Sequence, residues 1–244
     1  MNAAFLTFTC ERDAALVPLW AQAVRRLCPA APLVAAVDRA DADMPLPKKV
    51  TRFVTDFARG GNLNGLPAIA GILGAMLDVA RHTGLPVVKI DSDTVLSGAA
   101  WLHDLESFDY VGFEGGIPLH ASGMCYALTQ TGIEAILRGI SPWPWQTQGQ
   151  LPEDQTICTL ALMHAPAKIH PWAGGEHVLA FMPPHFGSPT VLRKAQTAIH
   201  CGQAGALAKY PGLDRTHLVS RMMRTTLRCL SGRQRRFPAP QPAP

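Results

Sequence analysis

Short apolar runs alternate along the chain with longer stretches in which apolar residues recur at helical spacing. The short runs, typical of strands buried in a sheet, occupy residues 4–9, 32–37, 50–54, 87–90, 110–113 and 122–128. The helical stretches span residues 13–27, about 67–83, 99–105, about 131–139 and the segment after Pro152. A helix between two apolar strands is typical of a βαβ unit, so we expect an α/β protein with a parallel sheet.

Two of these helices carry local signals for where they begin and end. Pro18 lies inside the stretch 13–27 and removes a backbone hydrogen bond, so the first turn of that helix is expected to be distinct. Thr131 and Glu134 fit a capping box that opens a helix, and Gly139 is expected to close it.

The composition fits one compact domain with a sizeable core. The chain has 244 residues, of which 48% are hydrophobic and 16% are charged, and a second full domain would be cramped. Its six cysteines include no Cys-x-x-Cys pair, which argues against a zinc cluster and predicts reduced thiols. The first residues lack a basic segment, and the longest uncharged run, residues 60–77, contains asparagines and a proline. We therefore expect a cytoplasmic protein with neither a secretory signal nor a membrane span.

The apolar run that starts at Val87 ends in two aspartates, Asp91 and Asp93, with Ser92 between them. Strand periodicity would place both carboxylates on the same side of the chain. Two carboxylates at the end of a buried strand repel one another, and a divalent cation beside them removes that cost. Ligands of open α/β sheets collect outside the carboxyl ends of such strands, although an Asp-x-Asp is also common in loops without a function. The stretch is therefore a candidate metal site.

Three other stretches bear on binding. The glycine- and asparagine-rich residues 59–65 precede a helix and either hold an anion on free backbone N–H groups or serve only as a connector. Glu153 and Asp154 lie at a helix start, where the macrodipole favours their charges and where plain capping is the simpler interpretation. Residues 10–13 follow the first strand without the Gly-x-Gly-x-x-Gly of dinucleotide-binding proteins, so a nicotinamide or flavin cofactor is not expected.

Taken in order, these pieces resemble the nucleotide-sugar-dependent glycosyltransferases of the GT-A fold, over about residues 3–205. The matching pieces are the N-terminal βαβ half, Asp91-Ser92-Asp93 after a buried strand, the strand at 122–128, Pro152-Glu153-Asp154 at a helix start, and a late histidine, His200. The resemblance implies a single Rossmann-like GT-A domain with a central mixed, mainly parallel sheet flanked by helices. It also implies a glycosyltransferase of the hexosyltransferase type that uses a divalent cation, Mn²⁺ or Mg²⁺.

The resemblance also implies roles for individual residues. Asp93 would be the main metal ligand and His200 a second one, while Asp91 would face the nucleoside or assist the metal through water. In an inverting enzyme Asp154 would be the general base that deprotonates an acceptor hydroxyl, and Glu153 would orient the acceptor or the loop. In a retaining enzyme Asp154 would have a different task, and the sequence leaves this choice open.

The donor implied by the resemblance is a nucleotide-diphosphate sugar. The first βα turn would lie under its base and ribose, and residues 59–65 would lie near the nucleotide. The residues expected to bind the nucleotide-sugar are Thr9, Cys10, Arg12, Asp13, Arg59, Asn64, Asp91, Ser92 and Asp93. The acceptor, whether a glycan, a lipid-linked molecule or a protein, is left open, and nucleic acid is not expected as a partner.

Two alternative functions remain. An apolar strand followed by Asp91-Ser92-Asp93-Thr94 also fits a phosphohydrolase of the haloacid-dehalogenase type, in which Asp91 would be the nucleophile and Asp93 the acid. Against it, the motif follows the fourth expected strand rather than the first, and no Gly-Asp-x-x-x-Asp stretch completes a magnesium site. The other alternative is a nucleotide-sugar-binding module without turnover, against which intact Asp93, Asp154 and His200 argue.

Positive charge is concentrated at the end of the chain. Seven arginines and no carboxylate side chain follow Asp214, whereas residues 1–214 hold 15 basic and 18 acidic residues. We expect a GT-A domain over residues 1–210, a basic helix over residues 211–236 and a disordered proline-rich tail over residues 237–244.

The expected basic helix would be amphipathic, with Asp214 as its N-cap. One side carries apolar residues, while Arg221, Arg224 and Arg228 lie on another. Such a helix either makes peripheral contact with the inner face of an anionic membrane or docks on the body with its arginines solvated.

Overall fold

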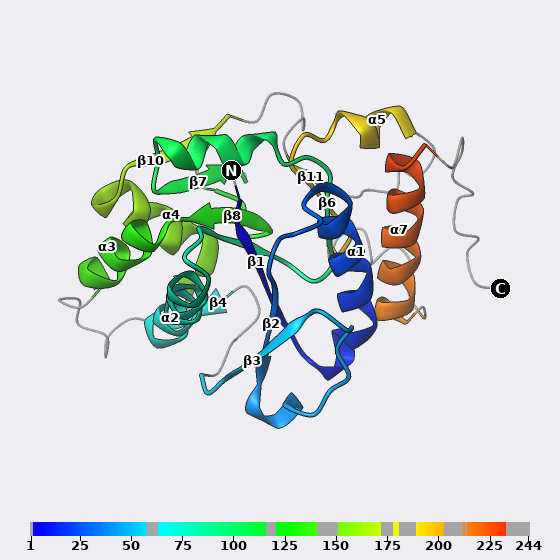
Figure 1. The fold of residues 1–244 in the computed structure, drawn as a ribbon, viewed down its shortest axis with the longest axis horizontal. Coiled ribbons are helices and arrows are strands. Elements are labelled where there is room, and N and C mark those ends of the chain that lie inside the picture. The colour runs from blue at the N-terminus through cyan, green and yellow to red at the C-terminus, as the bar shows by residue number, and fades with distance from the viewer. Residues whose placement is uncertain are drawn as a thin grey trace.

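The computed structural model describes residues 2–57, 63–115, 121–140, 151–171, 178–180, 189–202, 212 and 214–232. At its centre is a seven-stranded sheet in the order β10-β7-β8-β5-β1-β2-β3 (Figure 1). The strands are β1 (Ala4–Thr9), β2 (Leu33–Asp38), β3 (Thr51–Thr55), β5 (Val87–Ile90), β7 (Tyr110–Phe113), β8 (Cys125–Leu128) and β10 (Ala167–His170).

The strand directions confirm the predicted α/β class with a mixed, mainly parallel sheet. Every pairing within this sheet is parallel except those that β8 makes with β5 and β7. β1 lies between β2 and β5, and Phe5 is in register with both Leu33 and Val88. The carboxyl ends of β1 and β5 therefore lie side by side at one edge of the sheet, the edge at which α/β proteins bind ligands.

Helices cover both faces of the sheet (Figure 1). The 3₁₀ helices are η1 (Glu11–Leu16), η2 (Arg39–Asp41) and η3 (Ala100–Glu106). The α-helices are α1 (Val17–Leu27), α2 (Leu66–Thr83), α3 (Gln130–Ile140), α4 (Glu153–His164), α5 (Pro189–Lys194) and α7 (Arg215–Leu230). α1 connects β1 to β2 and α2 leads into β5, which gives the βαβ order that the sequence pattern predicts.

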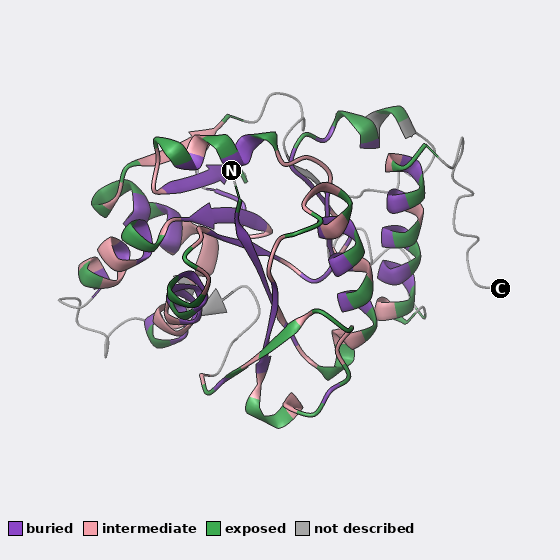
Figure 2. Ribbon diagram, in the orientation of Figure 1, coloured by how far each residue is buried: buried purple, intermediate pink, exposed green. Residues whose placement is uncertain are grey.

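Each face of the sheet has its own hydrophobic core. Ala4 and Leu6 belong to the core that includes α2, α3 and α4, whereas Phe5 belongs to the core that includes α1 and α7. This alternation follows from the period of two along a strand. The central strands are buried on both faces (Figure 2), which is why their sequences are continuous apolar runs.

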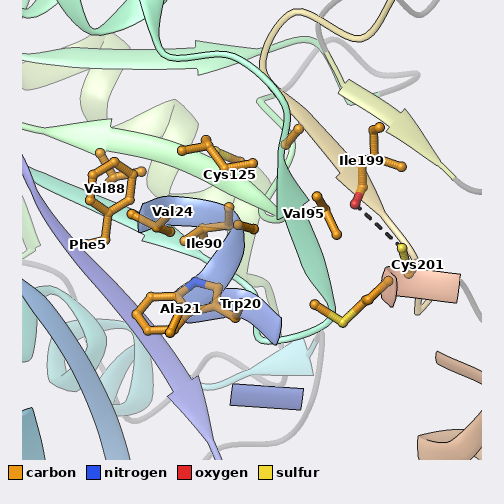
Figure 3. Close-up of a cluster of buried hydrophobic side chains, with 14 of the residues drawn as sticks. Phe5, Trp20, Ala21, Val24, Val88, Ile90, Val95, Cys125, Ile199 and Cys201 are labelled. Atoms are coloured by element: carbon orange, nitrogen blue, oxygen red, sulfur yellow. Dashed lines mark hydrogen bonds between the residues drawn. The ribbon is translucent and has the colours of Figure 1, made fainter. Parts of the chain in front are cut away.

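A smaller sheet packs on the α1 face. In it β6 (Thr94–Leu96) pairs antiparallel with β12 (Ala198–His200), which pairs in parallel with β11 (Val178–Ala180). Figure 3 shows Val95 of β6 and Ile199 of β12 in the same core as Trp20 and Ile90. β6 begins directly after the turn that follows β5. Ile90 before this turn and Val95 after it both lie in this core, which fixes the two ends of the turn. A two-stranded pair of β4 (Leu63–Asn64) and β9 (Leu151–Pro152) precedes α4.

The helix expected over residues 13–27 has two parts. It begins as η1 and becomes α-helical at Val17, with Pro18 in the first turn of α1. A proline is tolerated there because the first N–H groups of a helix have no intrahelical partner. The expectation of a distinct first turn is thus confirmed.

The capping box predicted for α3 is wrong in its details. The hydroxyl of Thr129, not that of Thr131, accepts a hydrogen bond from the N–H of Gly132 at 3.1 Å. The Glu134 carboxylate instead accepts a hydrogen bond from Arg81 of α2 at 3.0 Å, so it connects α3 to α2 rather than capping α3. Gly139 is the penultimate residue of α3, whose last described residue is Ile140.

The C-terminal helix α7 packs on the body of the domain. Its N-cap is Asp214, as expected, whose Oδ1 accepts from the N–H of His217 at 2.6 Å. The buried residues of α7 include Leu218, Val219, Met222, Met223, Thr226, Leu227 and Cys229. Arg221, Arg224 and Arg228 are exposed. The tail at 237–244 lies outside the described residues, and within the described part of the chain no helix is long and apolar enough to span a membrane.

Candidate metal centre

Asp91, Ser92 and Asp93 form a turn between β5 and β6. β5 ends at Ile90, and the N–H of Thr94 donates to the carbonyl oxygen of Asp91 at 3.0 Å. The prediction that strand alternation places the two carboxylates together is therefore wrong, because the turn does so instead. The N–H of Asp91 donates to the carbonyl oxygen of Met124 at 3.0 Å, which holds the turn against the start of β8.

His200 reaches this turn from the end of β12. It is in register with Thr94 of β6, and its Nδ1 lies 3.0 Å from the Thr94 hydroxyl and 3.3 Å from Oδ1 of Asp93. One possible ligand atom from each of Asp91, Asp93 and His200 lies within 4.8 Å of the others. Two carboxylates and one imidazole suit a divalent cation. These three residues can therefore hold a metal ion, and they are the ligand set that the resemblance implies.

Asp93 is only 7% exposed, yet its surroundings favour the charged form of its carboxylate. Burial alone would raise the pKa of Asp93, but His200 and Arg215 outweigh burial and lower it. Burial alone would lower the pKa of His200, and the Asp93 carboxylate beside it raises that pKa above its usual value. The metal-ligating form of Asp93 is thus the one that this environment stabilises.

Arg215, the first residue of α7, connects Asp93 to the first βα turn. Its Nη2 donates to Oδ2 of Asp93 at 2.9 Å, and its Nη1 donates to Oδ1 of Asp13 at 2.8 Å. Next to it, the hydroxyl of Thr216 donates to the carbonyl oxygen of Arg12 at 3.1 Å. The start of α7 is thereby fixed to η1 at the carboxyl edge of the sheet.

Lys89 lies below the turn, on the β5 face that packs against α2, α3 and α4. Its ammonium donates to Oδ1 of Asp91 and to the carbonyl oxygen of Gly123, both at 2.6 Å, and lies 3.6 Å from Oε1 of Glu153. Burial alone would lower the pKa of Lys89, but the charges of Asp91 and Glu153 outweigh it and hold the pKa above its usual value. Burial raises the pKa of Glu153, and Lys89 offsets only part of that effect.

Asp154 lies at the same edge of the sheet. A Cβ atom added to Gly123 would lie 3.0 Å from Cβ of Asp154, so the start of α4 packs closely against the start of β8. Oδ1 of Asp154 accepts from the N–H of Gln155 at 2.9 Å. Glu153 and Asp154 therefore approach the Asp91 turn, with Glu153 joined to it through Lys89.

The remaining predicted binding residues fall at three places. Thr9 is the buried last residue of β1, Cys10 precedes η1 and is half-buried, and Arg12 is exposed on η1. Asn64 lies in β4, where only the backbone is described, and pairs with Leu151 of β9. Arg59 lies outside the described residues.

Three residues of this site were missed in the sequence. Lys89 was a charged residue within an apolar strand, which is a usable signal because an unpaired buried charge is costly. No feature of the sequence marked Arg215 as part of the site, since its partner Asp93 is 122 positions away. Gly202 follows His200 closely, and a Cβ atom added to it would lie 1.7 Å from Oδ2 of Asp93.

The fold and this cluster define an α/β domain with a candidate metal centre at the carboxyl edge of its central sheet. Comparison of the sequence with models of known protein families gives no match, and comparison with curated proteins gives none either.

Proposed function

We propose that the chain is a metal-dependent glycosyltransferase of the GT-A type, which moves a sugar from a nucleotide-diphosphate sugar to an acceptor hydroxyl. The observation that supports it most is the convergence of Asp91, Asp93 and His200 within 4.8 Å at the end of β5. β1 ends at the same edge, and the α4 start that carries Asp154 packs beside it. This edge is where α/β sheets bind nucleotides.

The residues present fit a divalent cation. The Asp93 carboxylate is buried, and its Oδ1 lies 3.3 Å from Nδ1 of His200, so the two candidate ligand atoms are adjacent. Asp93 and His200 would be ligands, with Asp91 beside them, and Mn²⁺ and Mg²⁺ both accept such oxygen-rich sets. A cation held here supplies positive charge that stabilises a departing diphosphate.

The other residues have roles that their positions allow. Arg215 already bridges two carboxylates, and its guanidinium is a group that also binds phosphate oxygens. Asp154 is the candidate general base, because a base must lie within hydrogen-bond reach of the hydroxyl that it deprotonates. The first βα turn, with Asp13, would bind the nucleoside end of the donor.

Calorimetry with nucleoside diphosphates, with Mn²⁺ and then with EDTA, tests the proposal. We expect binding that requires the cation, and we expect Asp93→Ala to abolish this dependence. Because a ligand at a hundred times its Kd adds about 2.7 kcal/mol of stability, a thermal-shift panel of nucleotide-sugars would then identify the donor. Equal affinity with Mn²⁺ and with EDTA would refute the metal role. Hydrolysis of an aryl phosphate with Mg²⁺ would favour a phosphohydrolase instead.

A further inference from the structure

Lys89 is a buried cation in a strand that is otherwise apolar. Its residue is 6% exposed, and its neighbours along β5 are Val88 and Ile90. Burying an ammonium costs several kcal/mol unless acceptors surround it, and even a satisfied buried ion pair often adds little stability over apolar packing. The fold therefore does not require a lysine at this position, which points to a role in the site.

Each acceptor around Lys89 belongs to a different part of the site. Asp91 lies in the turn after β5, Gly123 lies before β8, and Glu153 begins α4. The ammonium donates hydrogen bonds to Asp91 and Gly123, and the Glu153 carboxylate lies at ion-pair distance. Lys89 also lies opposite Tyr126 of β8, with its Nζ 5.7 Å from the centre of that ring. The side chain is thus held from several sides and has little freedom to move.

We propose that Lys89 is a positioning residue of the metal centre, which fixes the Asp91 carboxylate and couples it to the start of α4. The inference rests on the proposed function. Asp93 is oriented by His200 and Arg215, whereas among the described residues the Asp91 carboxylate pairs with Lys89. Glu153 then serves as a counter-ion of Lys89 rather than as a residue that orients the acceptor. Groups that orient metal ligands in this way typically contribute about 10–100-fold to metal affinity.

A double variant separates positioning from charge balance. Lys89→Met alone removes the hydrogen bond to Asp91 but also leaves the buried Glu153 without this ion pair, so it risks misfolding. Lys89→Met combined with Glu153→Gln removes one positive and one negative charge, so the net charge of the site stays the same. Any loss of metal affinity in the double variant therefore reports on the position of Asp91.

The matched control is Lys168→Met. Lys168 also pairs with an aspartate, its Nζ lying 2.8 Å from Oδ1 of Asp104, but it lies on β10 at the far edge of the sheet. The same substitution there removes a lysine-aspartate pair without touching the metal centre. We expect this variant to bind Mn²⁺ like the unmodified chain.

The test is Mn²⁺ binding by calorimetry and by electron paramagnetic resonance, with thermal unfolding of each variant as the check on folding. We expect the double variant to unfold at a higher temperature than Lys89→Met and to bind Mn²⁺ about 10-fold or more weakly than the control. A double variant with the affinity of the unmodified chain, or one that does not fold, would make Lys89 a structural residue and overturn the inference. If the unmodified chain binds Mn²⁺ no better than Asp93→Ala, the metal centre itself fails, and the inference falls with it.

Discussion

Gly202 offers the sharpest test of the metal centre, because a single added methyl group would collide with a proposed ligand. A Cβ atom at this position would lie 1.7 Å from Oδ2 of Asp93 and 2.5 Å from its Cγ. Ordinary carbon–oxygen contacts are about 3.3 Å or longer, so the carboxylate or the backbone must move by more than ~1 Å. Gly202 does not have a positive φ, so the effect of alanine comes from the collision and not from backbone strain.

The displacement can be converted into an expected loss of affinity. Ligand distances in metal sites are held to within about 0.2 Å, so a shift of more than ~1 Å removes Asp93 as an effective ligand. We expect Gly202→Ala to weaken Mn²⁺ binding at least about 10-fold, in the range found when a group that orients a ligand is lost. Overpacking of this kind also costs about 1–3 kcal/mol of stability, so the variant should still fold.

The matched control is Gly74→Ala on α2. A Cβ atom there would meet nothing within 4 Å, and alanine in a helix interior stabilises the fold by roughly 0.5–1 kcal/mol relative to glycine. Calorimetry with Mn²⁺ and thermal unfolding on both variants complete the comparison. If Gly202→Ala binds Mn²⁺ with the affinity of the control while Asp93→Ala does not bind it, the added Cβ atom does not displace Asp93 and the expected collision is wrong.

Two further predictions concern catalysis and the basic helix. Asp154→Asn keeps a side-chain oxygen that can accept the hydrogen bond from the N–H of Gln155. We therefore expect binding of the nucleotide-sugar donor to persist while the rate of sugar transfer falls about 10²-fold or more. A normal rate of transfer would mean that Asp154 only caps the helix. For the helix, we expect replacement of Arg221, Arg224 and Arg228 by glutamate to reduce sedimentation with anionic liposomes, since each arginine contributes about 1 kcal/mol near such a surface. If the unmodified chain also stays in the supernatant at low salt, the membrane proposal fails.

The design of the liposome experiment follows from the packing of α7. Removing the whole helix would also remove Val219, Met222 and Met223 from the core, together with the ion pairs of Arg215. Charge reversal at exposed positions leaves that packing in place. Because the apolar side of α7 is buried against the body, any membrane contact made by α7 would depend on its exposed polar side, which carries the three arginines.

The fold was predictable because its strands are buried on both faces. Such strands appear in the sequence as continuous apolar runs, and the run at 110–113 has the same bounds as β7. Helix ends were less predictable, since a hydroxyl can cap a helix from more than one position. The sequence pattern predicted Thr131 as the cap of α3, whereas the hydroxyl of Thr129 accepts from the N–H of Gly132.

The metal site was predictable only in part. Asp91 and Asp93 are marked by their spacing after an apolar run, whereas His200 was selected only through the resemblance of the whole pattern to a family. The groups that orient these ligands come from distant segments, as the 202 positions between Asp13 and Arg215 show. Contacts of this kind leave no periodic pattern, so three-dimensional packing alone reveals them.

The position of Arg215 shows how the core and the site depend on one another. Arg215 begins α7, and the helix behind it is held by Leu218, Val219 and Met222 in the same core as Ile90, the residue just before the Asp91 turn. The guanidinium is therefore placed by apolar packing as well as by its ion pairs with Asp13 and Asp93. Burial of the α7 face fixes the backbone of Arg215, and the ion pairs with Asp13 and Asp93 order its side chain, which lowers the conformational entropy lost if the guanidinium then binds a phosphate.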